Sequence, residues 1–217
     1  MSNWAITVGI GLGHLLFGMP PDETAALGEI YGEATSQADE ASASGSVIDV
    51  LLEQMPASPE RDELVASLRA ESAGKVSQSL GDGRVVLSFM DGRLQEITLG
   101  AEARNVQFEG LLLFVAPERE VVEDLALRDP GARIAEDDIR YPALGIALYG
   151  FAELTAQRGI SFPPVPNPER AVVLYQPHKA ATLGVTSRVI VDPLPEEFGP
   201  LTLPLLEGVD GCSGPQG

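Results

Sequence analysis

Alternating side-chain polarity marks the middle of the chain as a run of β-strands. Residues 76–80, 84–90 and 93–99 are short segments rich in strand-forming residues, separated by Gly81-Asp82-Gly83 and by Asp91-Gly92. An Asp-Gly pair between alternating segments is the strongest short-range hairpin signal, because these residues tolerate the positive φ that a tight turn requires. The pattern therefore predicts a three-stranded antiparallel meander.

Helical spacing of apolar residues predicts four helices, over residues 21–28, 46–55, 59–73 and 117–127. The first and the last open with proline and acidic residues. These suit the first turn of a helix, because its N–H groups lack partners there and its dipole is positive. Ser58 is the expected N-cap of the third helix.

The rest of the chain divides between strands and loops. Further strands are expected at residues 4–8, 106–115, 141–151, 171–175 and 188–191. Loops are expected at residues 33–46, which are small and polar, and at residues 158–170, which are rich in proline.

This order of elements predicts an α+β fold with helices packed on an antiparallel β-sheet. Because strand, helix and further strands occur twice in succession, we interpret the chain as two repeated helix-then-meander units that share a core. We expect a single α+β domain over residues 1–210, with sub-units 1–100 and 101–195, followed by a flexible tail over residues 211–217.

The charge of the chain is negative and unevenly distributed. The formal net charge is −18, from 32 acidic and 14 basic residues. Residues 1–60 contain nine acidic residues and residues 189–217 contain five, and neither segment contains Lys or Arg. This balance argues against nucleic acid or an anionic membrane surface as partner, because both repel carboxylates. It favours a basic protein partner, a cation, or a role in solubility alone.

An apolar run at residues 4–19 precedes the first expected helix. No Lys or Arg comes before it, glycines interrupt it, and it is shorter than the ~20 residues that a bilayer span needs. We interpret it as a buried strand and loop, and expect a cytoplasmic protein. The single cysteine, Cys212, cannot form an internal disulfide and so gives no indication of an oxidising compartment.

Few residue patterns indicate catalysis or cofactor binding. Gly9-Ile10-Gly11-Leu12-Gly13 lacks the G-x-G-x-x-G spacing of dinucleotide loops and favours close backbone packing at a turn. His14 and His178 are the two histidines, too few for a His/Cys metal site. Glu136-Asp137-Asp138 lacks the ligand spacing of a calcium loop. We expect no enzyme activity, cofactor or metal, although a carboxylate pair brought together by folding stays open as a catalytic site.

Two segments resemble a known group of proteins. Phe17-Gly18-Met19-Pro20-Pro21-Asp22-Glu23, which leads to Leu27-Gly28, resembles the opening of small bacterial proteins that place helices before an antiparallel sheet. Arg84-Val85-Val86-Leu87-Ser88-Phe89, with the Asp91-Gly92 turn, Arg93-Leu94 and Ile97, resembles their meander. Over residues 15–150 the combination is similar to polymorphic-toxin immunity proteins and, more distantly, to the tandem-repeat fold of β-lactamase inhibitor proteins. The chain departs from the pattern at Thr24-Ala25-Ala26 and in the extra segment 33–46.

This resemblance implies a protein without an active site, which binds and neutralises a cognate toxin. Toxins that attack nucleic acids are often basic around their catalytic cleft, so an acidic inhibitor gains association rate by electrostatic steering. The residues expected to bind the partner are Asp22, Glu23, Glu29, Glu33, Asp39 and Glu40. Two alternatives stay open: a carboxylate-based enzyme, and a structural or assembly factor of a secretion or phage-like system. The oligomeric state is also left open.

Overall fold

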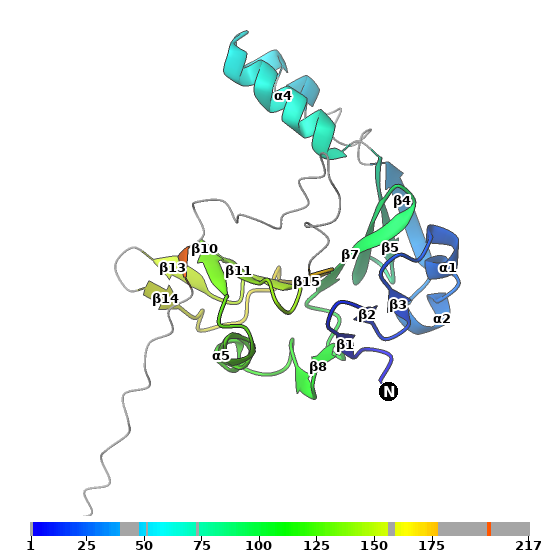
Figure 1. Cartoon of the computed structure of the whole chain (residues 1–217), viewed down its shortest axis with the longest axis vertical. Helices are drawn as coiled ribbons and strands as arrows, with labels where there is room; N and C mark the ends of the chain where they lie inside the picture. Colours follow the sequence, from blue (N-terminus) through cyan, green and yellow to red (C-terminus); the bar gives the residue numbers. More distant parts are fainter. Residues whose placement is uncertain are drawn as a thin grey trace, which may run out of the picture.

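The computed structural model describes residues 2–39, 48–50, 52–72, 74–155, 159–177 and 199–200. Its centre is a nine-stranded β-sheet in which every pair of neighbouring strands is antiparallel (Figure 1). Across the sheet the strands are ordered β16 (Gly199–Pro200), β10 (Arg133–Ala135), β11 (Asp138–Tyr141), β12 (Ile146–Tyr149), β15 (Ala171–Tyr175), β7 (Arg93–Gly100), β6 (Val85–Met90), β5 (Lys75–Leu80) and β4 (Ala34–Asp39). The predicted α+β fold with an antiparallel sheet is confirmed.

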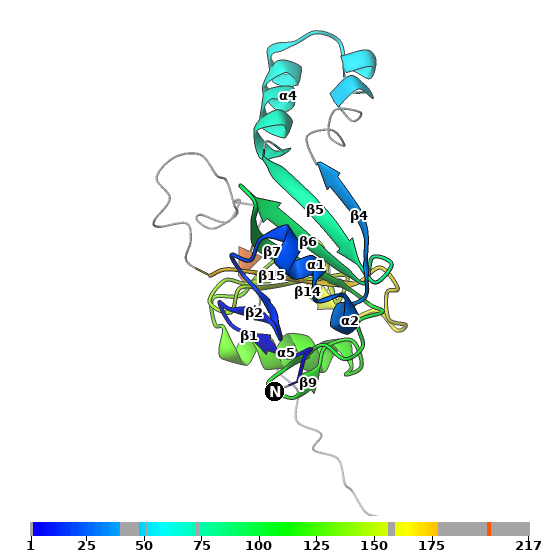
Figure 2. The ribbon, with the colours of Figure 1, turned by 90° about the vertical axis from the view of Figure 1, so that its right-hand side faces the viewer.

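Helices and short hairpins cover one face of this sheet, which we call the helical face (Figures 1 and 2). The covering helices are α1 (Pro21–Ala25), α2 (Gly28–Tyr31) and α5 (Glu118–Arg128). The covering hairpins are formed by β1 (Ile6–Thr7), β2 (Gly11–Leu12) and β3 (Leu15–Leu16), and by β8 (Gln107–Phe108) and β9 (Leu111–Leu112).

The same order of elements occurs twice along the chain. Residues 2–100, the N-terminal half, run from a hairpin through α1 and α2 to strands β4 to β7. The described residues from 101 onwards, the C-terminal half, run from a hairpin through α5 to β10, β11, β12 and β15. β7 and β15, the last of the four sheet strands named for each half, pair from Ala171↔Gly100 to Tyr175↔Glu96 and so form the junction. The two hairpins also meet, because the Gln107 N–H donates to the Trp4 carbonyl at 2.9 Å.

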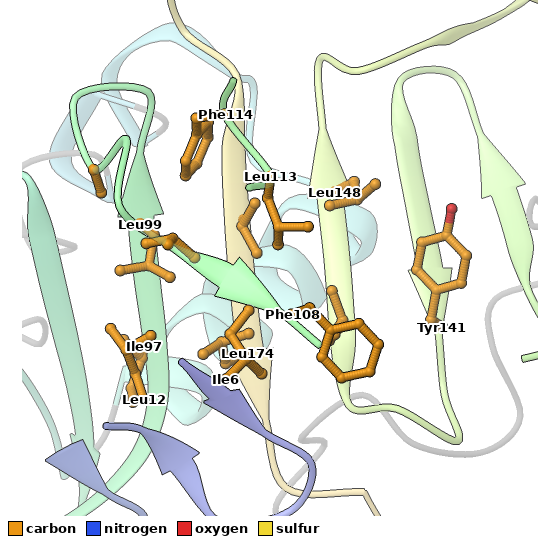
Figure 3. Close-up of a cluster of buried hydrophobic side chains, with 14 of the residues drawn as sticks. Ile6, Leu12, Ile97, Leu99, Phe108, Leu113, Phe114, Tyr141, Leu148 and Leu174 are labelled. Atoms are coloured by element: carbon orange, nitrogen blue, oxygen red, sulfur yellow. The ribbon is translucent and has the colours of Figure 1, made fainter. Parts of the chain in front are cut away.

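The core lies between the sheet and its covering layer (Figure 3). One row of buried side chains crosses six strands on the helical face: Tyr141, Ile146, Leu174, Ile97, Leu87 and Gln78. Ile6, Leu12, Phe108 and Leu113 from the hairpins pack over this region of the sheet (Figure 3). The row ends in a polar side chain on each side. The Tyr141 hydroxyl donates to the Val122 carbonyl of α5, and Gln78 Oε1 accepts a hydrogen bond from Thr24 of α1.

Each half carries an insertion before its last strands. In the N-terminal half it lies between β4 and β5 and contains helical residues 48–50 and 52–54 and helix α4 (Pro59–Ser72). This helical arm, comprising the described residues of 48–72, projects away from the sheet (Figures 1 and 2). In the C-terminal half the insertion lies between β12 and β15 and contains the hairpin of β13 (Glu153–Thr155) and β14 (Gly159–Ser161).

Several local predictions are confirmed. The meander at 76–99 is β5, β6 and β7, with Asp91 and Gly92 at φ 52° and 69° in its second turn. Helix 117–127 is α5, and helix 59–73 is α4. The Ser58 hydroxyl accepts the Arg61 N–H at 3.2 Å, which is the expected N-cap bond. Helix 21–28 is replaced by the two short helices α1 and α2.

Other local predictions are wrong. The loop expected at 33–46 begins as a strand, β4, because pairing with β5 outweighs the weak strand propensity of its small polar residues. The strand expected at 106–115 is a hairpin, folded back at Gly110, whose φ is 93°. The strand expected at 141–151 is shortened to β12, after a turn that contains Gly145 with a φ of 64°. The loop expected at 158–170 contains β14.

The strand predicted at 188–191 and the tail predicted at 211–217 lie outside the described residues. Within the described part of the chain, no helix is long and apolar enough to cross a membrane.

Candidate interaction surfaces

Two consecutive short helices carry three of the six acidic residues that the sequence singled out, and a fourth, Glu33, follows them. Pro20 occupies the N-cap of α1 and Pro21 its first turn, where a proline removes no intrahelical hydrogen bond. Asp22 and Glu23 follow in the same turn, where the helix dipole favours carboxylates. After a break at Leu27, α2 ends at Gly32, whose φ of 98° favours glycine.

Buried polar side chains fix the orientation of these helices. Thr24 of α1 is fully buried, and its hydroxyl donates to Gln78 Oε1 of β5 at 2.9 Å. Tyr31 of α2 is also fully buried, and its hydroxyl lies 2.7 Å from the Asn3 carbonyl and accepts the His14 N–H at 2.9 Å. Burial raises the pKa of Tyr31, although the hydrogen bond from His14 acts in the opposite direction. With these two residues inward, the acidic residues of the same helices point outward.

The side chains of Asp22, Glu23, Glu29 and Glu33 are all exposed. We call these four residues the acidic surface. Within the described residues none of the four carboxylates is part of an ion pair. The structure therefore brings together four of the six residues expected to bind a partner. Asp39 is the last residue of β4, and Glu40 lies outside the described residues.

The glycine-rich segment of the first hairpin is closely packed. A Cβ at Gly13 would lie 1.9 Å from the Asn3 carbonyl oxygen, and one at Gly11 would lie 2.0 Å from that of Leu15. Neighbouring backbone therefore leaves no room for a side chain at either position, in agreement with the packing interpretation of this segment. His14 is exposed, with Nε2 at 3.2 Å from Asn3 Oδ1. His178 lies outside the described residues.

A second cluster lies on the opposite face of the sheet, where side chains alternate with those of the core. Both Nε and Nη2 of Arg140 donate to Asp138 Oδ2, at 2.9 and 2.6 Å. Tyr149 is opposite Asp138 across β11 and β12, and Tyr175 is opposite Glu96 across β15 and β7. Arg and Tyr are the residue types that dominate the energetics of binding sites. No sequence pattern pointed to this cluster, because the register of three separate strands assembles it.

The electrostatics of this cluster follow from its burial. Desolvation raises the pKa of Tyr149, and the nearby Asp138 carboxylate raises it further. Desolvation also raises the pKa of Tyr175, against the opposing charge of Arg140. Burial alone would lower the pKa of Arg140, but the hydrogen bond and the charge of Asp138 outweigh it, so that this pKa is raised.

In the C-terminal half, arginine pairs with three of the four acidic residues of α5. Arg119 lies 3.3 Å from Glu123, and Arg128 lies 3.0 Å from Asp124, each pair one turn apart on α5. At the N-terminus of α5 the buried Glu118 forms an ion pair with the buried Arg170, whose Nη2 also donates to the Phe114 carbonyl at 2.7 Å. The helix of this half therefore presents a surface on which charges are largely paired.

Within the described residues, no group of three or more His, Cys, Asp and Glu side chains is arranged to hold a metal ion. No protein-family model matches the chain, no curated protein matches it, and no solved structure matches it. The resemblance to immunity proteins therefore stays a prediction that depends on the residues quoted for it.

Proposed function

We propose that this protein is an inhibitor of the immunity type, which binds and neutralises a basic bacterial toxin through its acidic surface. The observation that supports the proposal is the set of exposed carboxylates on α1, α2 and the residue before β4, none of which is ion-paired within the described residues. These four residues belong to a 60-residue segment without Lys or Arg.

Unpaired charges of one sign at the surface act mainly on the rate of association. They attract a partner of opposite charge before contact, and the acceleration is about 10- to 1000-fold at low ionic strength. The effect is screened by salt, because the Debye length falls to about 8 Å at physiological ionic strength. The proposed function therefore requires association that slows as salt is added.

The first step of the test is to identify the partner. The protein is used to capture partners from its native host at low and at high salt, and a captured basic protein is then expressed with and without this protein. Neutralisation predicts that co-expression restores growth of cells in which the captured protein alone is toxic.

The second step assigns the surface. A variant with Asp22→Asn, Glu23→Gln, Glu29→Gln and Glu33→Gln is expected to associate with the toxin about tenfold more slowly in low salt. The matched control neutralises four exposed acidic residues of the C-terminal half, Glu102, Glu120, Glu136 and Asp137, and changes the net charge by the same amount. Equal rates for the two variants in stopped-flow measurements would exclude the acidic surface as the docking site. The absence of any basic partner would contradict the proposed function itself.

A further inference from the structure

The N-terminal half ends at an open edge of the sheet. β4 pairs on one side with β5, and within the described residues it has no strand on its other side (Figure 2). After a register shift between Ala34 and Ser36, the pairing runs without interruption to Asp39. An open edge presents a row of unpaired N–H and C=O groups, which is a template for another strand.

The equivalent edge of the C-terminal half is covered. β10 is the first sheet strand after α5, as β4 is the first after α2. On its outer side β10 pairs with β16 in antiparallel register, Arg133↔Pro200 and Ile134↔Gly199. The duplicated architecture therefore already contains one example of a strand added at this position.

The open edge also lacks the residues that commonly protect edges. Natural edge strands often carry Lys, Pro, bulges or inward-pointing charges, which hinder pairing with other chains, and of these β4 has one register shift near its start. β4 has the sequence Ala-Thr-Ser-Gln-Ala-Asp, without Lys, Arg or Pro. Its only charged residue is Asp39 at its end, and the exposed Glu33 precedes its start.

The two flanking acidic residues define the chemistry of the strand that would fit. A strand added to β4 lies about 4.8 Å away, so its terminal residues lie beside Glu33 and Asp39. Opposite charges on facing strands are stabilising, and like charges are destabilising. A second copy of β4 would bring its own acidic residues to these positions, whereas a strand with Lys or Arg at both ends would complement them.

The geometry points to β4 as the docking edge for an extended segment of the basic partner, with a basic residue at each end of about six residues of strand. This inference rests on the proposed function and deepens it, because it names the backbone that receives the toxin. The acidic surface attracts the partner, and the β4 edge holds one of its strands by main-chain hydrogen bonds.

The test uses the full chain and a synthetic peptide, Lys-Thr-Val-Thr-Val-Lys, whose two lysines lie on opposite faces of a strand, as positions 33 and 39 do after the register shift between Ala34 and Ser36. Binding is measured by calorimetry, and amide hydrogen exchange of residues 34–39 by NMR. The peptide is expected to slow exchange at alternate residues of β4. A peptide with Glu in place of both Lys is expected to bind at least about tenfold more weakly, since two cross-strand charge pairs change sign. Methylation of alternate backbone nitrogens along one peptide edge is expected to abolish binding.

Two protein variants assign the charge preference. Glu33→Gln with Asp39→Asn should remove the difference between the Lys and Glu peptides, whereas the control Glu120→Gln with Glu136→Gln, at exposed residues outside the acidic surface, should retain it. Failure of the Lys peptide to slow exchange in β4 overturns the inference, as does equal binding of both peptides. A dimer whose β4 amides are protected without peptide also overturns it, and would favour an assembly factor. If the toxin still associates in a manner that depends on the acidic surface, only the docking edge is wrong and the proposed function stands.

Discussion

In the C-terminal half, α5 is fixed by a buried ion pair in addition to the hydrogen bond from Tyr141, whereas in the N-terminal half α1 and α2 are fixed by hydrogen bonds between neutral groups. Glu118 and Arg170 form that ion pair, while Thr24 bonds to Gln78 in the other half. The exposed acidic residues on the helices of the two halves also differ. Glu123 and Asp124 of α5 pair with arginine, whereas the acidic residues of α1 and α2 remain unpaired within the described residues.

This difference shows how a duplicated architecture can divide two tasks. Ion-paired charges, whether buried or exposed, contribute to local structure but attract a charged partner only weakly. Charges that are exposed and unpaired contribute little to stability and remain available for steering. We therefore expect the C-terminal half to respond to substitution mainly through stability and the N-terminal half mainly through binding.

The largest effect should come from breaking the buried ion pair of the C-terminal half. Arg170→Met leaves the Glu118 carboxylate buried without its partner, which typically costs about 3–5 kcal/mol of unfolding free energy. The measurement is the denaturant midpoint at constant m-value. Arg119→Met, which breaks an exposed pair on the same helix, should cost less than about 1 kcal/mol.

A double variant separates two costs: the loss of the ion pair itself, and the burial of the Glu118 carboxylate without a partner. Glu118→Gln combined with Arg170→Met should recover part of the lost stability, because no buried carboxylate remains uncompensated. If the double variant is as unstable as the sum of the two single variants, the pair is not the cause of the effect.

A smaller effect is expected from the equivalent bond in the N-terminal half. Thr24→Val keeps the shape of the side chain but leaves the buried Gln78 Oε1 without this donor, a cost of about 1–3 kcal/mol. Thr98→Val, on the opposite face of the sheet, is the control and should stay within about 0.5 kcal/mol of the parent. Similar losses of unfolding free energy in both variants would show that the hydrogen bond does not fix α1.

The smallest change in unfolding free energy at neutral pH should come from substitution of Tyr141. The same substitution should have a larger effect on the pH dependence of stability in alkali. Burial raises the pKa of its hydroxyl, and the Asp129 carboxylate raises it further. Above the pKa of about 10 in the unfolded chain, the unfolded state loses this proton first, so stability falls by about 1.4 kcal/mol per pH unit until the folded pKa is reached.

Tyr141→Phe should therefore cost about 1 kcal/mol at pH 7, where the bond to the Val122 carbonyl is lost. It should also make the alkaline decline less steep, while the raised pKa values of Tyr31, Tyr149 and Tyr175 maintain the remainder. The cost is read from the unfolding free energy at neutral pH. The alkaline slope is read from unfolding free energies between about pH 8 and 11, a range that includes the ordinary pKa of tyrosine. Parallel curves for Tyr141→Phe and the parent would show that the buried hydroxyl does not control alkaline stability.

The parts of the fold that sequence predicted well are those in which local chemistry and tertiary structure agree. Asp91-Gly92 adopts the positive φ values that its turn requires, and Pro117 with its following acidic residues begins α5. β4 was missed because Ser, Thr, Gln and Ala give no alternation of apolar and polar residues, and only pairing with β5 makes that segment a strand. The hairpin at Glu109-Gly110 was missed because apolar residues on both sides read as one continuous strand.

The two candidate surfaces also differ in how far local sequence predicts them. The acidic surface follows from sequence, because its residues lie close together in the chain, on or just after two consecutive short helices. The cluster of Arg140, Tyr149 and Tyr175 could not be predicted, because its members come from three strands and meet only through the register of the sheet. The buried pair of Glu118 and Arg170 joins residues 52 positions apart and is equally invisible to local patterns.

The helical arm occupies a place where a tight turn would suffice. β4 and β5 are adjacent antiparallel strands, and Asp39 lies opposite Val76 at the end where the chain leaves for the arm. The entropic cost of closing a loop rises by only about 0.6 kcal/mol for each doubling of its length. The stability of the sheet therefore depends little on the length of the segment that connects these strands. The junction is thus a natural grafting point: a reporter domain could replace the arm there while the duplicated sheet keeps its register.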